Sequence, residues 1–365
     1  MRNDIATVAE LERFDALLDV RSPAEFALDH LPGAINVPVL DDAERASVGT
    51  MYVQDSPFFA RKVGAALVAR NIAQHIDEKF AGHDRAWKPL VYCWRGGMRS
   101  GSMTTILRAI GWDARQLDGG YRTFRRHVVA DLDVLPIPLS FRVVCGPTGS
   151  GKTRLIGALA AAGCQVLDLE SIAAHRGSLL GGWPDRPQPS QKAFETRLWA
   201  AIRRLDPARP IYVEAESRKI GDLRVPEALM TKMRAADCMR IDTPDAARVD
   251  LLMREYAHFF AEPAVLVDKL KALTALHGHA RIEALVQDAE AWRWKALVAA
   301  LLAEHYDPAY EKSAATHFFG LARATRIAIT DTSEAALIAA AKAIAAAEER
   351  DAAPQAMPAM GEASA

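Results

Sequence analysis

Short apolar runs alternate with helix-like patterns along the first 130 residues of the chain. The apolar runs predict four buried strands, at residues 16–20, 35–37, 90–93 and 114–117. The segments between them carry apolar residues at helical spacing and predict helices at residues 23–30, 58–80, 100–110 and 121–130. Ser22 and Glu25 form a capping-box pattern, and Pro23 stands between them at the first helical position. Strands that alternate with helices in this way are typical of an α/β fold with a mostly parallel sheet.

A second α/β pattern follows residues 131–138. Pro136 and Pro138 disfavour a regular helix or a central strand in this segment and predict an extended linker. Beyond it we predict strands at residues 141–145, 164–169, 211–215 and 326–330, helices at residues 152–162 and 335–350, and a helical insertion at about residues 243–311. The predicted domains are therefore residues 1–135 and 136–350. Residues 351–365 offer little that could pack and predict a disordered tail.

Length and composition agree with two globular domains. Domains usually contain roughly 100–200 residues, and this chain has 365, of which 50% are hydrophobic and 25% charged. The first residues open no apolar signal segment, and no stretch reaches the roughly 20 apolar residues of a transmembrane helix. The four cysteines include no C-x-x-C pair, which argues against a disulfide scaffold and a zinc ribbon. These features predict a soluble, cytoplasmic protein that does not engage a membrane.

Basic residues are concentrated in one part of a chain whose net charge is −1. Residues 186–240 contain twelve lysines and arginines against seven acids, a pattern that suits either an RNA backbone or solvated helix faces. The candidate nucleic-acid-binding residues in this segment are Arg203, Arg204, Arg218, Lys219 and Arg224. Trp292 and Trp294 alternate with basic residues and could stack on bases. Helical spacing puts them on different faces, so at least one of them should belong to the core.

A cysteine stands between a predicted strand and a predicted helix. Cys93 opens a loop that carries two glycines and two arginines, with the residues Trp94, Arg95, Gly96, Gly97, Met98, Arg99 and Ser100. Backbone N–H groups and the dipole of the following helix converge at such a position and lower the pKa of a thiol. The glycines let the loop curl, and the arginines add positive charge. The pattern indicates a thiolate nucleophile rather than a buried structural cysteine.

Three stretches within residues 5–130 resemble the rhodanese family. They are LDVRSPAEF at residues 18–26, HLPGAINVP at residues 30–38 and LDGGY at residues 117–121, in the order and at the spacing of that family. In rhodaneses the loop cysteine carries a persulfide, and the resemblance assigns this role to Cys93. Sulfur-transferring members usually place an arginine five residues after the cysteine, whereas Arg99 stands six residues after it.

This longer spacing has two interpretations. Cys-x5-Arg is also the spacing of cysteine phosphatases, including those with a rhodanese fold, but phosphatase chemistry generally needs a general acid and the loop supplies none. The longer loop also implies a wider pocket, which could hold a tetrahedral oxyanion or a chalcogen larger than sulfur. The second interpretation is favoured, and the first stays open.

A phosphate-binding loop occupies residues 146–153. The sequence GPTGSGKT fits G-x-x-x-x-G-K-[ST] and lies between a predicted strand and a predicted helix, as this motif requires. Backbone amides of such a loop cradle a polyphosphate, Lys152 would neutralise it, and Thr153 could hold Mg²⁺. The predicted phosphate-binding residues are Gly146, Thr148, Gly149, Ser150, Gly151, Lys152 and Thr153.

Acidic residues follow two of the predicted strands near this loop. NTP hydrolysis normally needs an acid on a neighbouring strand, and Asp168 and Glu214 are the candidates, although each could be a solvated strand-end carboxylate. Glu216 shares the strand end of Glu214, where open α/β sheets bind ligands. His175 and Arg176 are candidates for a substrate contact, while an isolated histidine is usually structural. No residue set indicates a firm metal site.

Taken in order, these motifs resemble the bacterial tRNA 2-selenouridine synthases over about residues 5–330. The matching parts are the Cys93 loop, residues 146–153, residues 168–170 with Glu170, and residues 175–178. The resemblance implies an N-terminal rhodanese-like domain and a C-terminal P-loop NTPase-like α/β domain. It also implies a transferase that geranylates wobble 2-thiouridine of tRNA with geranyl diphosphate and then exchanges the S-geranyl group for selenium from selenophosphate.

This resemblance also sets expectations for cofactors and partners. No cofactor would be bound permanently, Mg²⁺ remains a candidate, and an enzyme that supplies selenophosphate is a candidate partner. Cys93 would carry selenium transiently. Two other classes stay open: an NTP-driven tRNA sulfurtransferase or other rhodanese/P-loop enzyme, and a non-catalytic RNA-binding module in which the Cys93 thiol would have an ordinary pKa.

Overall fold

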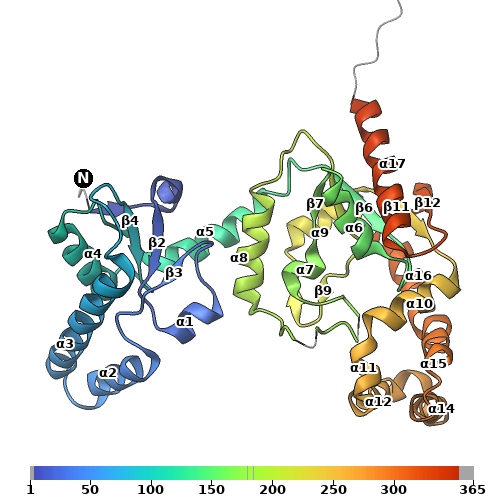
Figure 1. The fold of residues 1–365 in the computed structure, drawn as a ribbon, viewed down its shortest axis with the longest axis horizontal. Helices are drawn as coiled ribbons and strands as arrows, with labels where there is room; N and C mark the ends of the chain where they lie inside the picture. The colour runs from blue at the N-terminus through green and yellow to red at the C-terminus, as the bar shows by residue number, and fades with distance from the viewer. Residues whose placement is uncertain (1–3, 179, 184, 353–365) are drawn as a thin grey trace, which may run out of the picture. The chain divides into compact units, whose positions relative to one another are not determined.

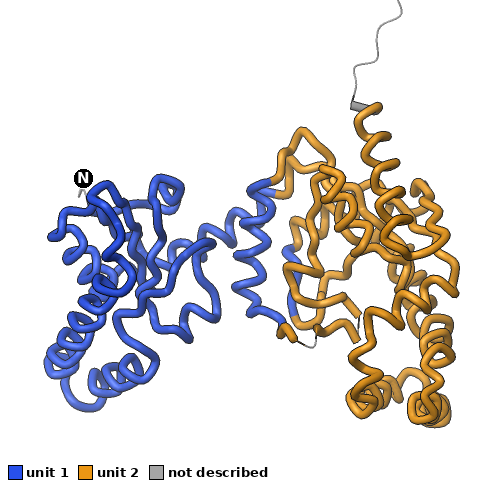
Figure 2. Tube along the Cα trace, in the orientation of Figure 1, with its two compact units in different colours: residues 1–135, 188–204, 223–226 blue, residues 136–187, 205–222, 227–365 orange. Residues whose placement is uncertain are grey.

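The computed structural model describes residues 4–178, 180–183 and 185–352, in two compact units (Figure 2). Unit 1 comprises Met1–Leu135, Gln188–Arg204 and Leu223–Pro226, and unit 2 comprises Pro136–Pro187, Leu205–Asp222 and Glu227–Ala365. The first cut in the chain therefore falls inside the segment predicted as a linker. Two later segments return to unit 1, which a division into consecutive domains does not anticipate. Most of the predicted tail, residues 353–365, lies outside the described residues.

Unit 1 contains a five-stranded, wholly parallel sheet with the order β1-β5-β4-β2-β3. Its strands are β1 (Ile5–Ala6), β2 (Ala16–Asp19), β3 (Ile35–Asn36), β4 (Pro89–Tyr92) and β5 (Arg115–Leu117). The central strand β4 is buried along its whole length and ends immediately before Cys93. A parallel sheet aligns the carboxyl ends of its strands, so the loops after β4 and β5 meet at one edge.

Helices cover both faces of this sheet (Figure 1). They are η1 (Val8–Arg13), α1 (Pro23–Leu28), α2 (Asp42–Gln54), α3 (Pro57–His75), η2 (Ile76–Phe80), α4 (Met98–Ile110) and α5 (Gly120–Val134). Serines cap two of the helices: Ser22 precedes α1 in a capping box, and Ser56 accepts hydrogen bonds from the first turn of α3. One core packs α3 and α4 against the sheet around Val91, Met103 and Leu107.

A helix distant in sequence completes unit 1. Helix α8 (Gln191–Ile202) packs against α5, with Phe124 and Trp199 in edge-to-face contact at 5.4 Å between ring centroids. The indole N–H of Trp199 donates a hydrogen bond to Asp131, and the Thr196 hydroxyl donates one to buried Asp29. Helix α5 thus contacts the sheet at β5, and α8 covers α5.

The predicted extended linker is wrong over its first half. Helix α5 continues through Asp131 to Val134, because Leu132 packs in the core and the first proline stands only at position 136. Proline has no backbone N–H to continue a helix and disfavours helix in the residue before it, so the helix ends where Pro136 requires it to end. Pro136 to Leu139 then form a turn before the next strand.

Unit 2 contains a second parallel sheet, with the order β12-β11-β6-β8-β7. The strands are β6 (Phe141–Cys145), β7 (Gln165–Leu167), β8 (Ile211–Glu214), β11 (Asp237–Asp242) and β12 (Thr325–Ala328). Two short strands also occur outside these sheets, β9 (Lys219–Ile220) in unit 2 and β10 (Leu223–Arg224) in unit 1. The phosphate-binding loop follows the central strand β6, whose direct neighbours are β8 and β11.

Helices α6 (Lys152–Ala161) and α17 (Glu334–Ala352) pack together on one face of this sheet, and α9 (Glu227–Ala235) contacts β6 from the other. Helix α7 (Leu169–Ala173) follows β7 directly. The helical insertion was predicted at about residues 243–311 and continues to residue 323. It consists of α10 (Asp245–Glu255), α11 (Ala257–Ala261), α12 (Pro263–Lys271), α13 (Thr274–His277), α14 (His279–Glu290), α15 (Trp294–Leu301), η3 (Leu302–Tyr306), α16 (Asp307–His317) and η4 (Leu321–Arg323). These helices share a core of their own around Phe259, Leu270 and Leu297.

Both units therefore confirm the predicted α/β class with parallel sheets and a helical region in the second half. The strands predicted at residues 141–145 and 90–93 match β6 and β4 to within one residue. Strand β11 and helices α2, α8 and α9 were not predicted, because each mixes polar and apolar residues without a clean period. Among the described residues no helix is long and apolar enough to span a bilayer.

Candidate functional site

Cys93 lies in a tight loop between β4 and α4. Gly96 adopts a φ of +63°, and Gly97 is the residue before the first turn of α4. The start of α5 closes the other side, since the amides of Tyr121 and Arg122 donate to the carbonyl oxygens of Cys93 and Trp94 at 2.9 and 3.0 Å. Gly120 is needed there: a Cβ at this position would lie 2.3 Å from the Cys93 carbonyl oxygen.

Hydrogen-bond donors surround the Cys93 sulfur. The thiol is 3% exposed, and its Sγ accepts from the Gly97 amide at 3.3 Å and from the Ser100 hydroxyl at 3.1 Å. Burial raises the pKa of the Cys93 thiol, but the hydrogen bonds from Ser100 and from the amides of Gly97 and Arg95 outweigh it, so that the pKa is lowered overall. The loop stabilises a thiolate.

The two arginines of the loop do not act on this thiolate directly. Arg99 forms an ion pair with Glu25 of α1, with Nη1 and Oε2 2.7 Å apart, and this pairing lowers the pKa of Glu25 against the effect of burial. The Arg95 side chain is exposed, as is Met98. Of the positive charge predicted from the sequence, that of Arg99 is therefore paired, and the hydrogen bonds of the loop rather than its arginine charges lower the pKa of Cys93.

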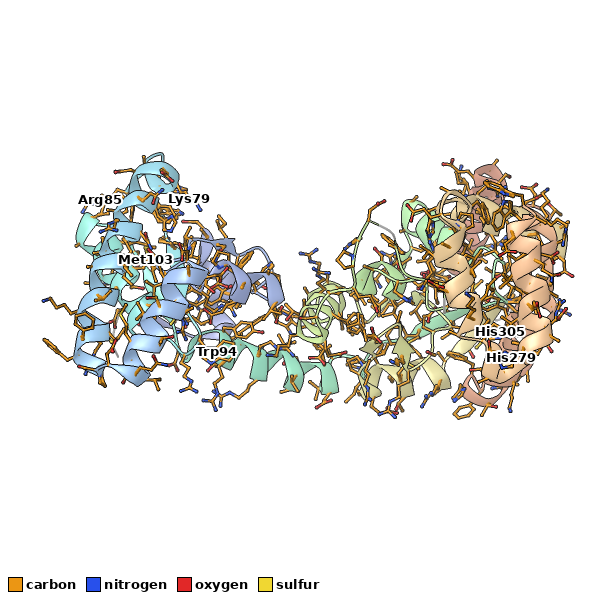
Figure 3. The ribbon with its side chains drawn as sticks, turned by 90° about the horizontal axis from the view of Figure 1, so that it is seen from below. Lys79, Arg85, Trp94, Met103, His279 and His305 are labelled. Carbon is orange, nitrogen blue, oxygen red and sulfur yellow. The ribbon has the colours of Figure 1, made fainter. Side chains whose placement is uncertain are left out.

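Aromatic and basic side chains frame the same loop. Trp94 lies beside the first turn of α5 (Figure 3), with its ring 5.2 Å from that of Tyr121. Lys192 of α8 places its Nζ 5.8 Å from the Trp94 ring centroid. Helix α8 therefore reaches the Cys93 loop. Met103, labelled in the same view, belongs to the core beneath the loop.

The phosphate-binding loop of unit 2 is held from two sides. The hydroxyl of Tyr310 accepts a hydrogen bond from the Gly146 amide at 2.7 Å, and Arg248 donates to the Thr148 carbonyl oxygen at 2.9 Å. Lys152 folds back onto its own loop and donates to the carbonyl oxygens of Gly146 and Pro147. The Ser150 hydroxyl is buried and has no hydrogen-bond partner among the described residues.

Glutamates crowd the space beside Lys152. The Thr153 hydroxyl donates to Glu170 at 2.7 Å, and Glu170 and Glu216 share a hydrogen bond. Burial, and next to it the negative charge of Glu170, raise the pKa of Glu216 to about 8. Glu214 ends β8, the neighbour of β6, and within the described chain neither of its carboxylate oxygens has a partner on another residue. Burial raises its pKa well above the ordinary range.

Asp168 occupies a different place from the other acids. It follows the edge strand β7, one strand further from β6 than Glu214, and it caps α7 by accepting from the Ser171 amide at 2.8 Å. Burial raises the pKa of Asp168. Over the described part of the chain, His, Cys, Asp and Glu side chains form no group of three or more that could hold a metal ion.

A cavity of about 540 Å³ opens at the phosphate-binding loop. Its lining combines the loop, the glutamates and basic side chains, including Thr148, Lys152, Thr153, Glu170, Glu216, Arg176, Arg218 and Lys219. A smaller apolar cavity of about 40 Å³ adjoins it and shares Thr148, Ser178, Leu252, Tyr256 and Tyr306 with it. The rest of the small cavity is formed by Leu180 and by leucines, phenylalanines and a valine of the helical region.

Arg176 lies at the border of the larger cavity, between two aromatic rings. Its guanidinium carbon is 5.0 Å from the ring of Tyr256 and 5.9 Å from that of Trp183, and its Nη1 has no hydrogen-bond partner in the described chain. His175 accepts from the Gly177 amide, and burial lowers its pKa. A bound anion could therefore use Arg176, whereas burial disfavours the charged form of His175.

The candidate tRNA-binding residues fall on both units. Arg203, Arg204 and Arg224 belong to unit 1, while Arg218 and Lys219 line the cavity of unit 2. The expectation for the tryptophans is confirmed, because Trp294 is buried and Trp292 is 65% exposed. Sequence reasoning did not find Gln116, which contacts Ser100, or Tyr310, which holds Gly146, because no local motif marks either residue.

Two family profiles match the chain. The profile described as tRNA 2-selenouridine synthase AAA domain matches residues 139–269, and that of the rhodanese-like domain matches residues 6–127. A solved structure, the N-terminal domain of a protein described as ATP/GTP-binding from Clostridium difficile 630, aligns with 34% of this chain and 98% of its own, at 31% identity and a TM-score of 0.31.

Full-length relatives carry one common name. The tRNA 2-selenouridine synthase of Nitrosomonas europaea is 38% identical over 247 residues, which cover 66% of this chain and 63% of that protein. That of Cupriavidus pinatubonensis is 33% identical over 353 residues, which cover 86% of this chain and 93% of that protein. The chain spans just under two thirds of the length of the first relatives it matches, 62% to 64%.

Proposed function

The chain belongs to the tRNA 2-selenouridine synthase family, and from this premise we propose that it converts wobble 2-thiouridine of tRNA into 2-selenouridine in two steps. In the first step the thiouridine sulfur attacks the first carbon of geranyl diphosphate, and pyrophosphate and a proton leave. In the second step selenium from selenophosphate replaces the geranylated sulfur. With one water, this exchange releases geranylthiol and phosphate.

One observation carries the first step: the phosphate-binding loop borders an apolar cavity. A prenyl diphosphate has an anionic head and an apolar tail, and the two adjoining cavities offer Lys152 with the loop amides to the head and leucine and phenylalanine side chains to the tail. A loop of this kind binds pyrophosphate without hydrolysing a nucleotide. The small volume of the apolar cavity means that the helices must move apart to admit a geranyl chain.

The Cys93 loop supports the second step. Its hydrogen bonds stabilise a thiolate, the form in which a cysteine is a nucleophile. We assign the handling of selenium to Cys93 and the contact with the diphosphate to Lys152, Thr153 and Arg176. Mg²⁺, if used, would be held by Thr153 and by phosphate oxygens of the substrate, since the described residues alone form no metal site.

The tRNA would be recognised through basic side chains near both sites. Arg218 and Lys219 at the cavity of unit 2 and Lys192 at the Cys93 loop are the candidates with structural support. Selenophosphate would come from the enzyme that makes it, a candidate partner.

An NTP-driven tRNA sulfurtransferase is the second candidate function. Glu214 favours it, because it ends the strand next to β6, where an acid that acts in nucleotide hydrolysis is expected. Its burial opposes this role, since it raises the pKa of Glu214 and so disfavours the charged form that a metal–nucleotide complex needs.

Nucleoside mass spectrometry separates the two functions. The full chain is incubated with 2-thiouridine-bearing tRNA, geranyl diphosphate and selenophosphate, and then with each small substrate omitted in turn. We expect 2-selenouridine in the complete reaction and S-geranyl-2-thiouridine when selenophosphate is omitted. Unchanged thiouridine from folded protein, together with ATP- or GTP-dependent release of phosphate, would instead support the sulfurtransferase.

A further inference from the structure

The Cys93 sulfur ends a chain of three hydrogen-bonded side chains. Gln116 Nε2 lies 2.7 Å from the Ser100 hydroxyl oxygen, which in turn lies 3.1 Å from Cys93 Sγ. Ser100 is fully buried, so water does not compete for its hydroxyl. Gln116 is not part of the Cys93 loop or of any motif in the sequence.

The orientation of the Gln116 amide follows from a second contact. Its Nε2 also lies 3.0 Å from the carbonyl oxygen of Gly97. A carbonyl oxygen can only accept a hydrogen bond, so the atom that faces it must be the amide nitrogen. The same nitrogen therefore donates to Ser100, and Ser100 accepts.

This donation decides where the Ser100 proton points. The hydroxyl has one hydrogen and two acceptors within reach, Cys93 Sγ at 3.1 Å and the Gly97 carbonyl oxygen at 3.3 Å. Gln116 donates to that carbonyl oxygen and to the hydroxyl oxygen. The Gly101 amide also donates to the Gly97 carbonyl oxygen, at 3.0 Å, so both lone pairs of that oxygen are used and the hydroxyl is left to donate to sulfur.

Strand pairing holds Gln116 in place. It lies on β5, opposite Val91 of β4 and opposite Ile5 of β1, so its backbone is fixed on both sides. Cys93 follows β4 directly. The distance between the amide and the loop is thus set by the register of the central strands and not by a flexible segment.

We propose that Gln116 is a positioning residue for Cys93, which directs the Ser100 hydroxyl proton at the sulfur and so keeps the thiolate hydrogen-bonded. The consequence for selenation rests on the proposed function, whereas the hydrogen-bond chain itself does not. The charged groups around the loop are Arg95, the Arg99–Glu25 pair from α4 and α1, and Lys192 from α8. The variants below leave all of them unchanged.

Gln116→Glu tests the direction of these hydrogen bonds, because it keeps the shape of the side chain and replaces the amide donor by a carboxylate acceptor. The Ser100 hydroxyl would then donate to the new carboxylate, and Cys93 Sγ would lose that hydrogen bond. We expect the pKa of Cys93 to rise by about one unit, which is about tenfold less thiolate below the pKa. The pKa is read from the pH dependence of iodoacetamide alkylation, quantified on the Cys93 peptide of the full chain.

The same substitution in a Ser100→Ala background separates the relay from a direct charge effect. If Gln116 acts through Ser100, Ser100→Ala alone raises the pKa and Gln116→Glu adds little to it. An equal rise in both backgrounds would mean that the added charge acts through space, and it would overturn the proposal. Gln116→Met removes the donor without adding charge, and an unchanged pKa in this variant, with unaltered thermal unfolding, would also overturn it.

The selenation assay then distinguishes this proposal from the proposed function. In Gln116→Glu we expect the pH profile of selenation to move to higher pH with the thiol, while geranylation keeps its profile. A shifted thiol pKa with an unmoved selenation profile would support the hydrogen-bond chain and overturn the role of Cys93 in selenation. An unchanged pKa of the Cys93 thiol would overturn the proposed Gln116–Ser100–Cys93 hydrogen bonding, whatever the selenation activity.

Discussion

The Cys93 loop and the phosphate-binding loop are built alike but differ in where their anion comes from. Each joins the carboxyl end of a central parallel strand to a helix through glycines. In the Cys93 loop the anion belongs to the protein, and donors from Gly97 and Ser100 already contact it. In the phosphate-binding loop Lys152 bonds to loop carbonyls instead. The first loop holds an anion without substrate, whereas the second, on the proposed function, gains its anion only when a diphosphate binds.

The acids beside the two loops differ in the same sense. Glu25 is charged and paired with Arg99, which neutralises the charge of that arginine beside the thiolate. Glu216 is crowded by Glu170, and its pKa of about 8 keeps it largely protonated at neutral pH. A protonated carboxyl beside Lys152 repels a diphosphate less than a carboxylate would. The comparison teaches that the negative charge of a glutamate beside an anion can be removed in two ways, by protonation at Glu216 and by an ion pair at Glu25.

The strongest test substitutes one side chain in each loop and asks whether each variant loses a different reaction step. We expect Cys93→Ser to reduce selenation by about 10³-fold or more while geranylation continues, because serine is a much poorer nucleophile. We expect Lys152→Ala to reduce geranylation by about 10²–10³-fold while selenation of pre-geranylated tRNA continues. Separate assays of the two steps by nucleoside mass spectrometry measure both. Cys164→Ser is the matched control, since this cysteine lies in neither loop; loss of both steps in a folded Cys93→Ser variant would contradict the division.

Glu216→Gln tests the role of the protonated glutamate through the pH dependence of the free energy of unfolding. A carboxyl whose pKa rises from 4.5 to about 8 on folding binds its proton more tightly in the folded chain, so the free energy of unfolding falls as pH rises through this window. Glutamine carries no titrating proton, so the variant should lose less stability between pH 5 and pH 8, by on the order of 2 kcal/mol. Hydrogen exchange of the β8 amides at both pH values measures this effect locally.

The control for that experiment is Glu255→Gln. Glu255 also lines the cavity of unit 2, but it pairs with Arg154 and is partly exposed. This variant should leave the pH dependence of β8 protection unchanged. Equal behaviour of the two variants would show that the pH dependence does not arise from the Glu170–Glu216 pair.

The smallest expected effect concerns the ion pair beside Cys93. Glu25→Gln releases Arg99 from its charged partner while the side chain keeps its length next to the Ser22 cap. We expect the pKa of Cys93 to fall by a few tenths of a unit, because the freed guanidinium adds weak attraction for the thiolate. Stability should change by no more than about 1 kcal/mol. A rise in the thiol pKa would mean that Glu25 supports the loop rather than restraining Arg99.

Most of the fold and both loops were predictable from the sequence because their signals are local. The glycine and lysine positions of residues 146–153 lie in one short segment between two regular elements, and the same holds for Cys93 and its glycines. Parallel α/β alternation follows from apolar runs and helical spacing alone. The fold class and the family resemblance are accordingly confirmed.

The remaining features depend on contacts between distant residues. Glu25 stands 74 positions before Arg99, and the sequence shows it only as a capping-box residue. Gln116 approaches Ser100 because β5 lies beside β4, which strand order decides and composition does not. The raised pKa of Glu216 needs Glu170 next to it, although they belong to different segments of the chain. None of these contacts can be predicted before the topology of the sheet is known.

The return of α8 to unit 1 has a consequence for heredity. The chain passes between the two units five times, at residues 135, 187, 204, 222 and 226. A gene fragment that ends at residue 135 would lack the helix that covers Phe124, so the thiol-bearing half cannot be exchanged as a cassette by one recombination event. A hybrid gene joined at that border would therefore encode a protein in which Phe124 lacks its covering helix.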